Sequence, residues 1–167
     1  MIRSEGANPI QTVSRSVVGF FQDDEMHWVA RLDCGHNRHM RHNPPMVSRP
    51  WVLTAERRAE QIGQMTTCMR CARFEMPPQM VAYKRTPVFT EETIPRGLLA
   101  DHATKRGVWA RIVVEEGAIA YIVEALEVRR TVTSAAPDVI VPEIRHRVAA
   151  VGMVRFFVRF YRAAGLT

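Results

Sequence analysis

The chain has 167 residues, of which 47% are hydrophobic and 24% charged, and its formal net charge at pH 7 is +6. These values are ordinary for a soluble globular protein with one domain or two small ones. No apolar run is long enough to span a membrane, and the N-terminus lacks the apolar core of a signal peptide, so the sequence predicts a cytoplasmic protein with no membrane partner.

The positive charge is almost entirely arginine, because Lys84 and Lys105 are the only lysines. Such a balance permits contact with nucleic acid or other anions without requiring it. The basic residues are spread along the chain rather than gathered in one block, which favours a solvated basic surface over a nucleic-acid footprint.

Residues 1–16 are polar and are expected to form a flexible head. Residues 17–21 and 27–32 then predict two strands around a polar turn. In the second run Trp28, Ala30 and Leu32 alternate with His27, Val29 and Arg31, which is the period of a half-buried strand. This hairpin ends at Cys34.

All three cysteines lie in two short motifs, CGH at 34–36 and CMRC at 68–71. Cys34, His36, Cys68 and Cys71 supply the four donors that a closed tetrahedral zinc site needs, and a catalytic zinc would instead keep a position open. We expect a structural zinc ion, with His39 or His42 as alternatives to His36. Free thiols, or one disulfide with an odd cysteine, are the competing interpretations; the paired spacing favours zinc. A small number of cysteines in metal-type spacing also indicates a reducing compartment.

Between the two motifs, three prolines exclude a regular helix over residues 44–50. Thr54 is placed to cap a helix over residues 55–62, and Gly63 is placed to end it. The unit formed by residues 17–73 is too small to fold on its own apolar core, so we expect the metal to stabilise it. Residues 74–80, rich in proline, are the expected linker.

The pattern VVGF-Q, HWVA-L-CGH-H-RHNPP, RPWV and C-x-x-C resembles a small uncharacterised bacterial domain family over residues 17–71. The resemblance implies a zinc site and no known activity. His39, Arg41, His42 and Asn43 belong to the same pattern, either as a binding surface beside the metal or as residues that brace the loop.

Residues 81–167 change to short β runs at 108–114, 118–123, 128–133, 139–141, 145–151 and 154–161. Several short strands at this spacing, without a long amphipathic helix, predict an antiparallel sandwich or barrel. We expect a turn at residues 115–117 between the first two of them.

The segments VAYKRTPVFTEETIPRGLL, DHATKRGVWARIVVEEGAIAY, VPEIRHRV and VRFFVRFYR resemble the YeaR-type and TehB N-terminal cupin-like domains of tellurite resistance. The resemblance covers residues 81–162. It implies a double-stranded β-helix barrel with His102 and His146 near a pocket, where a second divalent metal is an option. The usual first cupin motif is reduced here to His102, and Arg159 occupies a position that is acidic in many relatives.

In the last run, residues 155, 157, 159 and 161 share one face of a strand, and residues 154, 156, 158 and 160 share the other. The second face is the better candidate for packed core. If the relatives' acidic residue points inward, Arg159 and Arg111 would line the pocket and bind an oxyanion through paired hydrogen bonds. Solvent exposure of these arginines is an equally open interpretation.

The sequence therefore predicts a mainly β protein, with a small zinc-stabilised hairpin and helix module at residues 17–73 and a cupin-like barrel at residues 81–167. The favoured function is a stress-response protein of the tellurite or nitrosative type that binds a metal or a small anion. Two alternatives are a metal-dependent cupin enzyme using His102 and His146, and a nucleic-acid or protein adaptor acting through the basic module. A homodimer is compatible with each.

Overall fold

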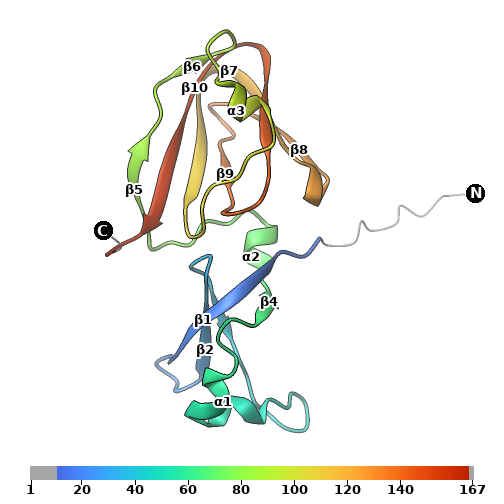
Figure 1. The fold of residues 1–167 in the computed structure, drawn as a ribbon, viewed down its shortest axis with the longest axis vertical. Coiled ribbons are helices and arrows are strands. Elements are labelled where there is room, and N and C mark those ends of the chain that lie inside the picture. Colours follow the sequence, from blue (N-terminus) through green and yellow to red (C-terminus); the bar gives the residue numbers. More distant parts are fainter. Residues whose placement is uncertain (1–10, 166–167) are drawn as a thin grey trace, which may run out of the picture.

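The computed structural model describes residues 11–165, most of which belong to two antiparallel β-sheets. Figure 1 shows the two sheets stacked along the long axis, with a short helix between them. Residues 1–10 of the polar head predicted at 1–16 lie outside the described residues, and the rest leads into the first strand, which begins at Ser14.

The first sheet has the strand order β3-β2-β1-β4, and its strands are β1 (Ser14–Gln22), β2 (Trp28–Leu32), β3 (Asn37–His39) and β4 (Met65–Thr67). The predicted hairpin is present, because β1 and β2 pair antiparallel with Phe20 opposite Ala30. Val29, Ala30 and Leu32 are buried, so β2 is covered on both faces at Val29 and Ala30 rather than strictly alternating.

Three short helices complete this half: the 3₁₀ turn η1 (Pro50–Leu53), α1 (Ala55–Ala59) and α2 (Met69–Ala72). The Thr54 hydroxyl accepts a hydrogen bond from the Arg57 N–H at 3.4 Å and caps α1 as expected. The helix is shorter than predicted, because residues 60–63 form turns that lead to Gly63 at a φ of 86°.

The second sheet has six strands on the path β5-β10-β7-β8, with β6 added to β10 and β9 added to β7. Its strands are β5 (Met80–Arg85), β6 (Phe89–Thr90), β7 (Trp109–Val123), β8 (Val128–Val132), β9 (Asp138–Ile140) and β10 (Arg147–Ala163). The short helices α3 (Arg96–Leu99) and η2 (Glu124–Leu126) lie in its connections.

Two long bent strands replace the four short strands expected at 108–123 and 145–161. β7 passes through Gly117, which has a φ of 75°, and β10 passes through Gly152, with a φ of 70° and a register shift between Val151 and Val154. A Cβ at Gly117 would collide with the Met153 carbonyl oxygen, so only glycine fits where the two bends meet. The residues predicted as a turn therefore bend one strand and curl the sheet (Figure 1).

The curled sheet confirms the mainly β fold. Its inner face is apolar and includes Phe156 and Val158, which are at most 5% exposed. The identification of this curl as a cupin barrel stays a prediction. Among residues 11–165, no helix is both long and apolar enough to cross a membrane.

Buried side chains of both halves belong to one continuous cluster. Trp109 on β7 is fully buried and packs edge-on against the His36 ring, with centroids 5.4 Å apart. Phe74 packs in the same way against Tyr121 at 6.1 Å. The two sheets therefore exclude water from a common boundary, and the cysteine motifs lie at that boundary.

Candidate metal centre

Cys34 and His36 sit on the tight turn between β2 and β3. The turn is closed by backbone hydrogen bonds from the Gly35 N–H to the Leu32 carbonyl and from the Leu32 N–H to the His36 carbonyl, each 2.9 Å long. Gly35 has a φ of 88°, and a Cβ there would run into the Met80 side chain. Glycine is therefore favoured by the left-handed backbone conformation, whereas the end of the flexible Met80 side chain could move aside.

Cys68 and Cys71 are presented by α2, in which Cys68 is the N-cap residue and Cys71 lies in the single turn that follows. The Cys68 N–H donates to the carbonyl of Val13, the residue before β1, at 2.7 Å, and this hydrogen bond joins the start of α2 to the first sheet. The two motifs, 32 residues apart, are brought together because β1 pairs with both β2 and β4.

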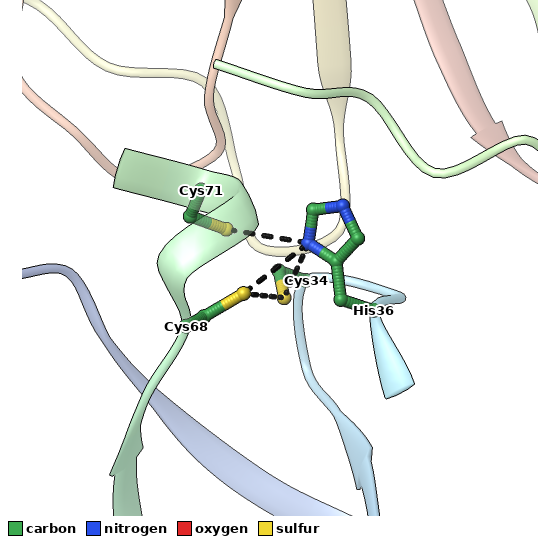
Figure 2. A group of neighbouring side chains, drawn as sticks. All are labelled: Cys34, His36, Cys68 and Cys71. Carbon is green, nitrogen blue, oxygen red and sulfur yellow. Dashed lines mark hydrogen bonds between the residues drawn. The ribbon is translucent and has the colours of Figure 1, made fainter. Parts of the chain in front are cut away.

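The four side chains turn their donor atoms toward one another (Figure 2). The Nδ1 atom of His36 lies 3.5 Å from Cys34 Sγ, 3.3 Å from Cys68 Sγ and 3.6 Å from Cys71 Sγ. The Sγ atoms of Cys34 and Cys68 are 3.9 Å apart, and all four donors lie within 4.8 Å of one another. Donors on a tetrahedral zinc ion, at about 2.3 Å for sulfur and 2.0–2.1 Å for nitrogen, are separated by roughly 3.5–3.8 Å.

The donor set is buried, since Cys34 and Cys71 are fully covered and His36 and Cys68 are at most 5% exposed. The Cys34 neighbour lowers the pKa of the Cys68 thiol by hydrogen bonding, and Cys71 acts in the same sense. The hydrogen bond with Cys68 raises the pKa of Cys34 to about 11, and those with Cys34 and Cys68 raise the pKa of Cys71. Three thiols this close cannot all ionise without strong repulsion between the thiolates, and a bound cation ordinarily stabilises three such thiolates together.

Trp109 holds the first motif in place, and Arg15 makes a second contact between the two halves. The indole N–H of Trp109 donates to the Cys34 carbonyl at 2.7 Å. Arg15, only 4% exposed, donates to the Pro142 carbonyl at 2.6 Å and pairs with Glu143 at 3.3 Å. Both contacts join the metal-binding half to the second sheet.

The alternative ligands His39 and His42 lie elsewhere. His39 is exposed, and its Nε2 lies 2.9 Å from a carboxylate oxygen of Asp23. The Nδ1 atom of His42 accepts a hydrogen bond from the Arg49 N–H at 2.8 Å and so braces the loop. Of the three histidines near the first motif, His36 is the one grouped with the cysteines.

His102 and His146 are brought side by side by an isolated antiparallel bridge, in which each backbone N–H donates to the carbonyl of the other residue at 2.9 and 2.8 Å. Their ring centroids are 4.3 Å apart. Both side chains line a cavity of about 400 Å³ inside the curled sheet.

Arg159 and Arg111 do not join this histidine pair. They are direct cross-strand neighbours on β10 and β7, and Arg85 of β5 lies opposite Arg159 on the other side. Because Val158 and Phe160 line the cavity, strand alternation turns Arg159 to the opposite face, where its guanidinium lies 5.4 Å from the Phe157 ring centre. Neither arginine lines the cavity, and an oxyanion-binding role of Arg159 and Arg111 stays a prediction.

Sequence reasoning missed the roles of Arg15, Trp109 and the two lysines. Arg15 fell within the predicted flexible head, although it precedes the apolar run that starts β1. No sequence signal pairs Trp109 with Cys34. Lys84 and Lys105 both line the cavity.

Comparison with known proteins gives two family matches, in different parts of the chain. Residues 18–75 match a family described as a protein of unknown function, DUF3565, and residues 84–158 match the TehB-like domain. No curated protein matches the chain.

Two solved structures resemble the second half. TehB from Haemophilus influenzae is 24% identical with a TM-score of 0.47, over 52% of this chain and 32% of that chain. A protein from E. coli strain K12 is 25% identical with a TM-score of 0.49, over 53% of this chain and 96% of that one. The chain thus spans about a third of TehB. Residues 84–158 are thus similar to the TehB-like domain, and residues 18–75 are similar to the DUF3565 family.

Proposed function

We propose that this protein is a zinc-containing binding protein related to tellurite resistance. In this proposal Cys34, His36, Cys68 and Cys71 hold one structural zinc ion, and the TehB-like domain offers a ligand cavity. The observation that supports it most is the buried group of four donors within 4.8 Å. Three sulfur donors with one imidazole suit zinc better than the oxygen-seeking magnesium or calcium.

The zinc ion would have a structural role, holding the β2–β3 turn and α2 together, rather than a catalytic one. Four protein donors complete its preferred coordination number, so no position is left for a substrate. Its ligands come from the β2–β3 turn, whose His36 ring packs on Trp109, and from the start and the turn of α2, which is followed by Phe74 packed on Tyr121. The free energy of metal binding then adds to the free energy of folding of this half.

Metal content tests the assignment. Elemental analysis of the full chain is expected to give one zinc per chain, and Cys68→Ser and Cys71→Ser are expected to lose it. His39→Ala is the matched control, because His39 is exposed and outside the donor group. Since the serine variants could fail to fold, cobalt substitution of the unaltered chain gives a second measurement: thiolate-to-metal charge-transfer bands should appear and should vanish on adding zinc. Full zinc occupancy in Cys68→Ser would sink the assignment.

The link to tellurite rests on the TehB-like domain. Expression of the full chain in a tellurite-sensitive bacterial host should raise the tolerated tellurite concentration, and Cys71→Ser should not. Equal tolerance with and without the chain would remove this part of the proposal and leave the zinc site untouched.

A metal-dependent cupin enzyme is the second candidate, favoured by one observation. The Nδ1 atoms of His102 and His146 each lie 2.9 Å from a backbone carbonyl, which leaves Nε2 free as in many metal-ligating histidines. The nearby carboxylates are engaged, however, since Asp101 pairs with Arg147 and Glu143 with Arg15. A second tightly bound metal, lost in His102→Ala while the first zinc remains, would support this candidate.

A further inference from the structure

The cavity inside the curled sheet is apolar over most of its wall. β10 contributes Phe156, Val158 and Phe160, and Val148 lies on the other limb of the same bent strand. At about 400 Å³ the cavity has the size of sites that enclose small organic molecules. The bend at Gly152 creates it, because the two limbs of β10 curl around one space.

One polar side chain faces this space without a partner. His146 is 1% exposed, and its Nε2 atom is buried without a hydrogen bond within residues 11–165. Its Nδ1 atom lies 2.9 Å from the Ile144 carbonyl, which can only accept, so Nδ1 carries the proton and Nε2 presents a lone pair. Burial lowers the pKa of His146 to about 4, so the ring is neutral near pH 7. A buried acceptor of this kind is costly to leave unpaired and calls for a donor.

The cavity also has a cationic rim. Lys84 and Lys105, the only lysines of the chain, both line it. Neither forms an ion pair within the described part of the chain, and no Asp or Glu lines the described cavity. Lys84 lies opposite Phe160 in the register of β5 and β10, whereas His146 directly precedes the other limb of β10.

From these features we infer that the cavity binds a small organic carboxylate with an apolar body and a hydroxyl group. The hydroxyl donates to Nε2 of His146, the body packs on Phe156 and Val158, and the carboxylate lies near Lys84 and Lys105. This inference deepens the proposed ligand-binding role of the TehB-like half and does not depend on zinc at the cysteine motifs.

A hydroxy acid explains the lining better than a bare metal ion. Two imidazoles fall short of the donors that a metal site needs, and the two lysines repel a cation. An inorganic oxyanion would satisfy the lysines but would leave the apolar wall and the His146 acceptor unused. The hydroxy acid meets all three features at once.

Isothermal titration of the full zinc-loaded chain with 4-hydroxybenzoate, benzoate and phenol tests the hydroxyl and carboxylate contacts separately. Benzoate lacks the donor, and phenol lacks the carboxylate. We expect 4-hydroxybenzoate to bind and each of the other two to bind about tenfold more weakly. His146→Phe, which keeps a ring but removes the acceptor, should abolish the preference over benzoate.

Adjacent residues of β5 provide the matched control. Lys84→Ala and Arg85→Ala each remove one positive charge from the same strand, but Arg85 lies over the Phe157 ring on the opposite face. Lys84→Ala should weaken 4-hydroxybenzoate about tenfold, and Arg85→Ala should leave it unchanged.

Four results would overturn the inference. The first is that no probe binds at millimolar concentration, and the second is that the unaltered chain binds benzoate and 4-hydroxybenzoate with equal affinity. The third is that Lys84→Ala and Arg85→Ala lose equal affinity for 4-hydroxybenzoate. The fourth is stoichiometric metal binding that requires His102 and His146. Zinc content measured on the same samples separates these results from failure of the cysteine site, because none of the substituted residues belongs to it.

Discussion

Replacing Trp109 by phenylalanine should destabilise the protein and loosen its metal site together. The substitution removes the indole N–H that donates to the Cys34 carbonyl at 2.7 Å, in a place where Trp109 and Cys34 are both fully buried. An unpaired buried carbonyl costs about 1–3 kcal/mol. The missing part of the ring adds about 1–2 kcal/mol of lost burial and cavity formation. The sum, about 3 kcal/mol, is a large share of a typical folding free energy of about 5–15 kcal/mol.

Urea unfolding followed by circular dichroism measures the first effect, and competition with a chromophoric chelator measures the second. Trp51→Phe is the control, because Trp51 is half-buried and packs edge-on to Phe20 at 5.9 Å, away from the cysteines. We expect Trp109→Phe to lose at least about 2 kcal/mol more than the control and to release zinc faster. If the two variants unfold alike and hold zinc alike, the assigned role of the Trp109 hydrogen bond is wrong.

Two further predictions concern the second half. A fragment starting at Pro78 should unfold cooperatively without metal, because its own strands bury Ile112 and Phe156. It should unfold at a lower urea concentration than the full chain, since Trp109 is no longer covered by the His36 ring. A disordered fragment would contradict the predicted boundary at residues 74–80. The pKa of His146 is lowered from 6.5 to about 4 by burial, with His102 and Asp101 as charged neighbours, so the unfolded chain binds its proton first as the pH falls. The stability contributed by the neutral ring is full above pH 6.5, is lost toward pH 4, and is reduced by about 2 kcal/mol at pH 5. Urea unfolding at pH 7.5 and 5 should therefore show a steeper loss than in His146→Gln, and equal losses would refute the argument.

The sequence was most informative where chemistry and spacing coincide. Cys34, His36, Cys68 and Cys71 were selected by residue type and by two short motifs, and the structure gathers these four residues. The Thr54 cap and the β1–β2 hairpin were predictable for a similar reason, because each depends on neighbours in sequence. Local preferences of this kind are retained in the folded structure whenever tertiary contacts do not oppose them.

Long-range placement was harder to predict. Gly117 was expected in a turn, and Gly152 lies between two runs that were expected as separate strands. Each instead permits a bend in a continuous strand, and sequence alone does not distinguish the two uses of a positive φ. Arg159 was considered for the pocket by position in a resembling family, although the alternation of Val158 and Phe160 already favoured the other face. The period of the strand was the better guide, because it follows from backbone geometry.

The boundary between the halves explains why neither is described fully by its own sequence pattern. Arg15 of β1 donates to the Pro142 carbonyl and pairs with Glu143, which holds a left-handed φ of 62° in the turn that leads to His146. A left-handed residue other than glycine costs about 1–2 kcal/mol, which contacts of this kind can offset. Trp109 of the second sheet in turn donates a hydrogen bond to the Cys34 carbonyl in the first half. Because each half donates a buried hydrogen bond to a backbone carbonyl of the other, we expect the free energies of metal binding and of folding of the curled sheet to be linked.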